Sequence, residues 1–169
     1  MSRVNQSVKV CVRALKLVLV AWLLATSPGC TNGSIPNTDV PDNEFNRKVL
    51  EFCEDYRHAV ERRNIALLMK LAAPSYYEDG GNADASDDLD YAGLHKYLET
   101  KFLQTKAIRY EIRYRKISKG DNEVINVDYT YSASYKIPYK GADAWKRTVA
   151  DNRLQLIPEG DSFRILSGM

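Results

Sequence analysis

Two alternating runs joined by a turn, over residues 107–137, constrain the fold of this 169-residue chain most strongly. In the first run isoleucine and tyrosine alternate with arginine and glutamate, and in the second apolar and aromatic residues alternate with small polar ones. This period of two, rich in β-branched and aromatic residues, is typical of half-buried antiparallel strands. Residues 119–122 (KGDN) have the chemistry of a turn. The stretch therefore predicts two paired strands.

The alternation assigns the side chains of this strand pair to two faces. The face expected inside carries Ile108, Tyr110, Ile112, Tyr114, Ile125, Val127, Tyr129, Tyr131, Ala133, Tyr135 and Ile137. The opposite face carries Arg109, Glu111, Arg113, Arg115 and Asp128, and cross-strand ion pairs there predict a solvated charge ladder. A β-bulge could turn the charged face inward and make Asp128 or Asp151 an acid/base candidate. The hydrophobic pattern argues against such a shift.

Two more strands are predicted after this pair. Residues 138–143 form a turn, and residues 144–157 alternate again, with Asn152 as the main polar side chain of the inward face. Residues 158–161 supply a last turn into residues 163–166. Four strands joined by short turns predict an antiparallel meander.

Three helices are predicted before the strands. The first follows a cap at Asp42 or Asn43, and its apolar side chains recur at helical spacing. Asn64 caps a second, shorter helix that Pro74 ends, and a third runs over residues 91–105. Helices followed by strands predict an α+β fold, with the three helices packed on one face of a curved antiparallel sheet. The apolar stripe of the first helix is Phe45, Val49, Phe52, Cys53, Tyr56, Ala59 and Val60.

The first 29 residues have the composition of a signal peptide. A basic leader without acidic residues precedes an apolar run at 17–25, which is shorter than the roughly 20 residues of a spanning helix. Residues 30–41 are polar, with two prolines, and predict a flexible tether. We therefore expect a signal peptide at 1–29, a tether at 30–41 and one folded domain at 42–169.

The end of this segment resembles the lipobox of a bacterial lipoprotein, in which a cysteine becomes the acylated N-terminus. Gly29 before Cys30 fits the pattern, whereas Ser27 and Pro28 depart from it. The resemblance implies lipidation of Cys30 by acyl chains such as palmitate, and a place in the bacterial cell envelope, anchored to a membrane and facing away from the cytoplasm. Ordinary secretory cleavage and an uncleaved anchor are the alternatives.

The charge balance depends on whether the leader remains. Four of the 24 basic residues lie in it, and the remaining 20 face 22 acidic residues, so the net charge changes from +2 to −2. The chain therefore gives no electrostatic reason to expect nucleic-acid binding.

The sequence offers no motif for catalysis or metal binding. The acidic stretch at 82–90 fails as an EF-hand, because Leu89 stands where the glycine belongs and His95 where the bidentate glutamate belongs. A metal site would need His58 and His95 to converge with carboxylates. Nucleophilic catalysis has no support either, because no serine or cysteine has a paired base at an informative spacing. We assign no catalytic residue, no metal and no cofactor.

The order of these elements, with the text VLEFCEDYRHAVERRNIALLMKLAAPSYYEDGG, resembles the nuclear transport factor 2-like (NTF2-like, SnoaL-like) superfamily over residues 44–167. The resemblance implies a cone, in which the sheet wraps around the long helix and leaves a pocket. Members include isomerases, cyclases, dehydratases and non-catalytic binding modules. Its enzymes generally place a carboxylate or histidine inside the cone, and the expected inward face here has neither.

We therefore predict a non-catalytic binding or scaffolding module with a tyrosine-lined pocket, the alternative being a small-molecule isomerase, cyclase or dehydratase of the SnoaL-like type. The predicted partners are a membrane through the lipid anchor, an apolar small molecule and a second copy of the chain. The pocket-lining candidates are Tyr56, Tyr76, Tyr77, Tyr110, Tyr129, Tyr131 and Asn152.

Overall fold

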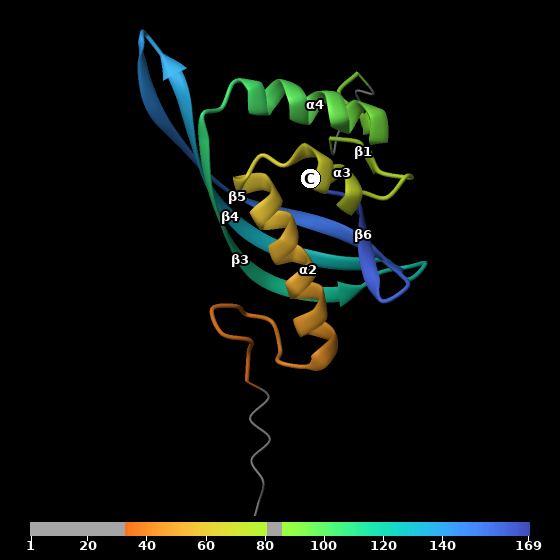
Figure 1. Ribbon diagram of the computed structural model, residues 1–169. Coiled ribbons are helices and arrows are strands. Elements are labelled where there is room, and N and C mark those ends of the chain that lie inside the picture. Colours follow the sequence, from red (N-terminus) through yellow and green to blue (C-terminus); the bar gives the residue numbers. More distant parts are fainter. Residues whose placement is uncertain (1–32, 81–85) are drawn as a thin grey trace, which may run out of the picture. The chain divides into compact units, whose positions relative to one another are not determined.

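The computed structural model describes residues 33–80 and 86–169, and Figure 1 shows their arrangement. The described part has three helices followed by a long meander, which confirms the predicted α+β fold. The elements are β1 (Tyr77–Glu78), β2 (Leu89–Asp90), β3 (Ala107–Lys119), β4 (Ile125–Tyr139), β5 (Ala142–Glu159), β6 (Ser162–Ser167), α2 (Glu44–Glu61), α3 (Ile65–Leu71) and α4 (Tyr91–Leu103).

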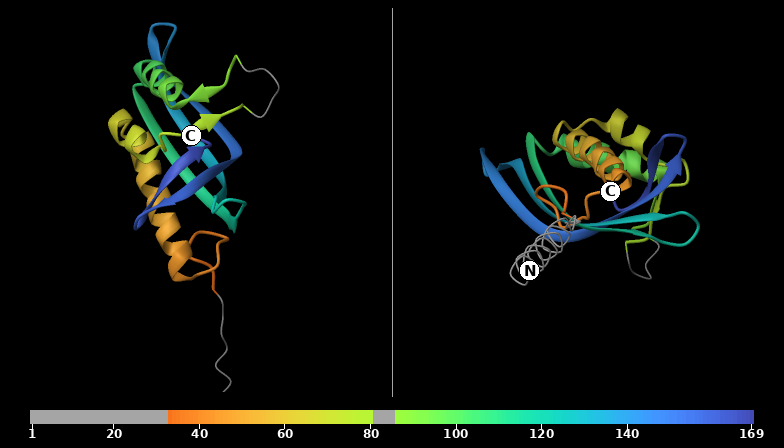
Figure 2. Two further views of the ribbon diagram at one scale, coloured as in Figure 1. Left: turned by 90° about the vertical axis from the view of Figure 1, so that its right-hand side faces the viewer. Right: turned by 90° about the horizontal axis from the view of Figure 1, so that it is seen from below.

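The large sheet is an antiparallel meander in the order β3-β4-β5-β6. It is strongly curved, and the helices lie on its concave side (Figure 2). The predicted faces are confirmed, since Tyr110, Tyr114 and Tyr129 are buried, and Arg109 and Arg113 are exposed. The inner face of the sheet is therefore the aromatic one.

A β-bulge does interrupt β3, but it keeps the charges outside. Tyr114 pairs with Tyr129 and Lys116 with Asp128, so Arg115 is the additional residue. Both Arg115 and Lys116 are exposed, and the next residue, Ile117, is partly buried again. The extra residue thus restores the alternation.

The outer face carries the expected charge ladder. The Arg153 guanidinium contacts the Asp128 carboxylate at 2.6 Å, and the Thr130 hydroxyl donates to Asp151 at 2.6 Å. The pairing of β4 with β5 places these groups opposite one another, since Asp128 faces Arg153 and Thr130 faces Asp151. Both aspartates considered as acid/base candidates therefore belong to outer-face contacts.

Side-chain caps start each helix. Asn43, Asn64 and Asp90 accept hydrogen bonds from backbone N–H groups in the first turns of α2, α3 and α4. Asn43 rather than Asp42 caps α2, and α4 ends at Leu103, two residues before the predicted end.

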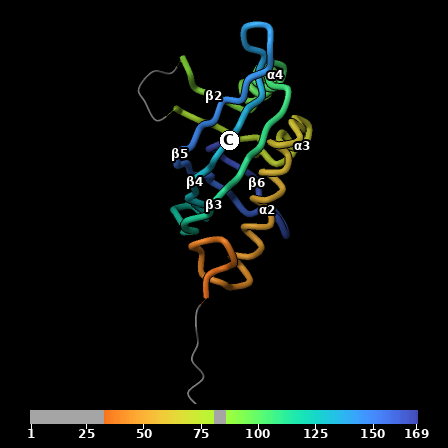
Figure 3. Tube along the Cα trace, turned by 90° about the vertical axis from the view of Figure 1, so that its left-hand side faces the viewer, coloured from red at the N-terminus to blue at the C-terminus, as the bar shows by residue number. Residues whose placement is uncertain are grey.

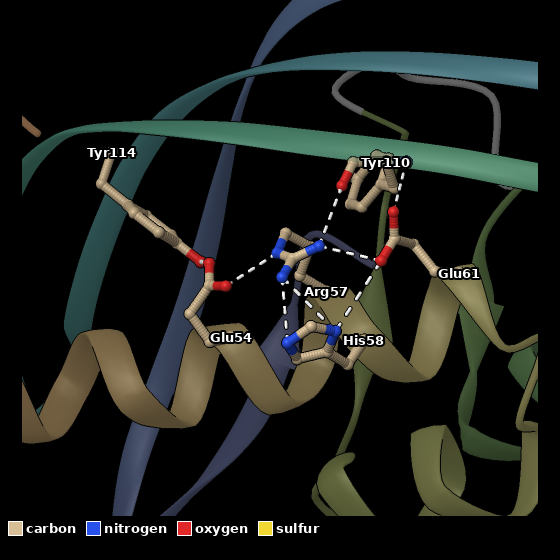
Figure 4. A network of polar contacts seen from close by, with 6 residues as sticks. All are labelled: Glu54, Arg57, His58, Glu61, Tyr110 and Tyr114. Atoms are coloured by element: carbon tan, nitrogen blue, oxygen red, sulfur yellow. Dashed lines mark hydrogen bonds and ion pairs between the residues drawn. The ribbon is translucent and has the colours of Figure 1, made fainter. Parts of the chain in front are cut away.

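A polar network joins α2 to the free edge of β3 (Figure 4). Glu61 accepts a hydrogen bond from the Tyr110 backbone N–H at 3.0 Å, and Arg57 donates to the Tyr110 carbonyl oxygen at 3.4 Å. Arg57 also contacts Glu54 at 2.7 Å and Glu61 at 2.9 Å. Since an unpaired strand edge leaves backbone groups without partners, the charged flank of α2 supplies partners for the backbone N–H and C=O of Tyr110 on this edge.

Residues 33–41 differ from the predicted tether. Val40 is fully buried, and the Asp39 N–H donates to the Tyr114 carbonyl oxygen at 3.0 Å. The Asp39 carboxylate accepts from Arg113 at 2.7 Å and from Arg115 at 2.9 Å. This segment is thus packed beside β3, next to the N-terminal end of α2 (Figure 3).

At the end of the acidic stretch, Leu89 and Asp90 form β2, which pairs with β1. Within the described ranges, no helix is long and apolar enough to cross a membrane.

Candidate functional site

A cavity of about 400 Å³ lies between the concave face of the sheet and the helices. Its walls come from α2, α3, α4 and from β3, β4 and β5, and they combine apolar, aromatic and polar side chains. This volume is at the lower end of the range for small-molecule sites. The lining residues are Tyr56, Val60, Leu68, Tyr97, Leu98, Lys101, Phe102, Gln104, Thr105, Ile108, Tyr110, Tyr131, Tyr135, Ile137, Lys146, Asn152 and Met169.

Tyrosine rings in edge-on and tilted contact form one wall of the cavity. The ring of Tyr110 packs edge-on against Tyr56, with centroids 6.3 Å apart, and lies 5.5 Å from the ring of Tyr131. Tyr129 is next to Tyr131 at 6.3 Å and is only 1% exposed. Alternation along β4 places Tyr129 and Tyr131 on the same face, and the pairing of β3 with β4 brings Tyr110 beside them.

The hydroxyl groups of Tyr56, Tyr110 and Tyr129 lie close to one another beside this wall. The Asn152 amide donates to the Tyr129 hydroxyl at 3.1 Å and to the Gly168 carbonyl oxygen at 3.1 Å. Burial raises the pKa of Tyr110 to about 12 and also raises the pKa of Tyr56 and Tyr129. These phenols are therefore protonated at neutral pH and can donate a hydrogen bond.

The charged residues that line the cavity are both cationic. Lys101 follows Tyr97 by four residues on α4, and its ammonium lies 5.3 Å from the centroid of the Tyr97 ring. Lys146 is on β5 and pairs with Tyr135, another lining residue. Among the described residues, neither aspartate, glutamate nor histidine lines the cavity.

Four of the seven predicted pocket residues line this cavity: Tyr56, Tyr110, Tyr131 and Asn152. Tyr129 lies behind the wall and touches it through its ring and hydroxyl.

Tyr76 and Tyr77 are elsewhere. Tyr76 is buried in the core, and its hydroxyl accepts from the Met169 N–H at 3.3 Å. Tyr77 is 53% exposed, and its hydroxyl donates to Asp88. Neighbouring residues of an extended segment point to opposite sides, so these two could not share one wall.

The predicted pocket set omitted the contribution of α4 and of the outer part of β5. Lys146 and Asn152 are an even number of residues apart on β5, so they share a face of the strand. Lys101 follows Leu98 by three residues on α4. Both spacings indicate the inner side, so the signal was present in the sequence.

The remaining site predictions concern Cys30 and metals. Cys30 lies outside the described residues. His58 and His95 are on different helices and lie near Glu61 and Glu99. Over the described ranges, no group of three or more histidine, cysteine, aspartate or glutamate residues could hold a metal ion.

Comparison with known proteins identifies the fold of the described domain. No family model matches the chain, and no curated protein matches its sequence. Solved structures match closely in architecture, however, and they include a proposed scytalone dehydratase from Novosphingobium aromaticivorans (TM-score 0.61, 10% identity, 73% of this chain and 80% of that one). A proposed dehydratase from the NTF2-like family of Streptomyces avermitilis also matches (TM-score 0.56, 12% identity, 73% and 92%).

A third similar structure is a proposed calcium/calmodulin-dependent protein kinase II association domain from Xanthomonas campestris (TM-score 0.59, 16% identity, 81% and 90%).

The described domain is thus an α+β domain with a pocket between helices and a curved sheet. Its fold is that of the NTF2-like (SnoaL-like) proteins, as the sequence predicts. Because the names of these similar structures include enzymes and an association domain, the fold does not choose the function.

Proposed function

We propose that the chain is a lipid-anchored domain of the bacterial cell envelope that binds a small apolar molecule without transforming it. The observation that carries the proposal is the cavity of about 400 Å³, walled by tyrosine rings and aliphatic side chains. Such a wall favours an apolar ligand, and the phenol groups supply a few donors that orient it.

The protonation state of the cavity supports binding over catalysis. General acid–base chemistry needs a group that exchanges its proton near the working pH. The described lining residues include no carboxylate or imidazole, and burial holds the pKa of Tyr110 at about 12. The phenols can donate a hydrogen bond to a ligand, but they do not remove a proton from it at neutral pH.

Filling the cavity tests the binding function. Val60 lines the cavity from α2, whereas Val149 is 57% exposed on the opposite face of the sheet. We expect V60W to abolish binding of naphthalene-2-carboxamide, a neutral apolar probe, measured by calorimetry with the protein in lipid nanodiscs. V149W is the matched control and should bind like the wild type. Equal binding by both variants, with both folded by circular dichroism, would contradict the proposal.

The anchor is tested separately through Cys30. A C30S variant should lose labelling by a palmitate analogue and should accumulate as an unprocessed precursor. A C53S variant is the control, since Cys53 is fully buried in the described domain. Unchanged labelling of the C30S variant would rule out the lipoprotein.

A second candidate function is a dehydratase, isomerase or cyclase reaction in the same cavity. It is favoured by the hydroxyl cluster of Tyr56, Tyr110 and Tyr129 beside the lining residues and by the names of two similar structures. A ligand that binds the wild type and emerges chemically changed, while Y110F binds it unchanged, would establish this alternative. Recovery of the intact ligand from both proteins supports the binding function.

A further inference from the structure

We propose that the ligand carries an acidic group, and that Lys101 and Lys146 recognise it as a carboxylate or similar anion. This inference rests on the proposed binding function and names the class of ligand. It follows from the charge of the cavity, the pairing of the surrounding lysines and the donors that the wall presents.

The first observation is the sign of the charge. The charged side chains among the described lining residues are Lys101, from α4, and Lys146, from β5. They come from two different elements, one a helix and one a strand, so they are not the solvated face of one element. Both side chains are also exposed to solvent, so their charges are accessible to a ligand that enters the cavity.

The second observation is that the described part of the chain supplies no anionic partner for either lysine. Within the described ranges, neither Lys101 nor Lys146 forms an ion pair. Two other lysines in the same region are paired, since Lys106 and Lys136 both contact the Asp143 carboxylate, at 2.6 and 3.2 Å. Lys106 and Lys136 are thus neutralised by the chain, whereas Lys101 and Lys146, which line the cavity, are left for a ligand.

The third observation concerns the remaining polar groups. The phenol of Tyr110 and the ammonium of each lysine are hydrogen-bond donors under neutral conditions. An anion accepts several such bonds at once, and charge-assisted bonds are stronger than neutral ones. The tyrosine rings would hold an apolar, aromatic body while the lysines bind the acid group.

A matched pair of probes tests the inference. The full-length chain in zwitterionic lipid nanodiscs is titrated by calorimetry with naphthalene-2-carboxylate and with its neutral amide, with empty nanodiscs as the blank. We expect the acid to bind about tenfold more tightly, since each solvent-accessible ion pair contributes up to about fivefold. The preference should weaken as the salt concentration rises.

Variants assign the effect to the two lysines. K101M and K146M should each reduce affinity for the acid, and together they should abolish the preference while the amide binds as before. K106M removes the same charge outside the lining and should leave the preference intact. K101M/K146E leaves one negative charge in the lining and should favour naphthalen-2-ylmethylamine over the acid.

The outcomes separate the two proposals. Equal affinity of the wild type for acid and amide would overturn the lysine inference and leave the binding function standing. A preference for the acid that survives in the double variant would overturn the inference as well. If neither probe binds the wild type, the binding function fails and the inference fails with it.

Discussion

Replacing Tyr129 tests whether the aromatic face of β4 is the core of the domain. The side chain is 1% exposed, and its ring lies 6.5 Å from that of Tyr114 and 6.3 Å from that of Tyr131. Truncation of a buried aromatic ring to alanine typically costs about 3–5 kcal/mol through lost burial and the cavity that remains. We expect Tyr129→Ala to destabilise the domain by this amount.

Tyr129→Phe separates the ring from the hydroxyl group. The hydroxyl accepts from the Asn152 amide at 3.1 Å and donates to the Gly168 carbonyl oxygen at 3.5 Å. Because Asn152 keeps its own bond to Gly168, loss of the hydroxyl should cost only about 1 kcal/mol. The ring should therefore account for most of the loss in the alanine variant.

Urea denaturation followed by circular dichroism measures both losses. With a slope of about 2 kcal/mol per molar urea, a loss of about 4 kcal/mol lowers the midpoint by about 2 M. Tyr139→Ala is the matched control on the same strand, because Tyr139 is 57% exposed and should change stability by no more than about 0.5 kcal/mol. A loss below about 1 kcal/mol for Tyr129→Ala would refute the assignment of this face to the core.

Three further perturbations test the edge, the ion pairs and a glycine. Glu61→Ala should cost about 1–3 kcal/mol and speed hydrogen exchange at the edge of β3, because a backbone N–H there loses its acceptor. Basic partners lower the pKa of Asp39 and Asp143, so their stabilisation is complete above about pH 4 and lost as the pH falls through the folded-state pKa values. A D39N/D143N variant should show a flatter loss of stability below pH 4 in urea titrations. Gly168→Ala should destabilise far more than Gly160→Ala in the same assay. Both have positive φ, but only the first would place its Cβ against a β5 carbonyl oxygen, at 1.9 Å.

The sequence predicted the meander well because each strand has two unlike faces. A one-residue slip of β3 would bury Arg109 and Arg113 and expose Tyr110. Only one register therefore keeps the charged side chains in solvent and the aromatic ones in the core. The bulge at Arg115 shows the same constraint, since the register changes without moving charge inward. Pattern alone could not give the position of the bulge, which depends on the pairing with β4.

The packing of residues 33–41 could not be predicted from local composition. Two prolines and no periodicity are typical of a tether, and the contacts that order the segment come from far along the chain. Asp39 binds Arg113 and Arg115 on β3, more than 70 residues away. A sequence pattern shows that those arginines are exposed, but not which carboxylate they meet.

For the two pocket lysines, the spacing along the strand or helix predicts the face of the element better than the residue type does. Lys146 is six residues before Asn152 on β5, an even spacing that assigns both to the inner face, and it pairs with Tyr135. Lys101 similarly follows Leu98 by one helical turn. Most lysines lie in solvent, which makes their type an argument for the outside. A lysine whose spacing assigns it to the inner face carries more information than another tyrosine there, because it adds a positive charge to the surface of the cavity, and within the described residues neither Lys101 nor Lys146 forms an ion pair.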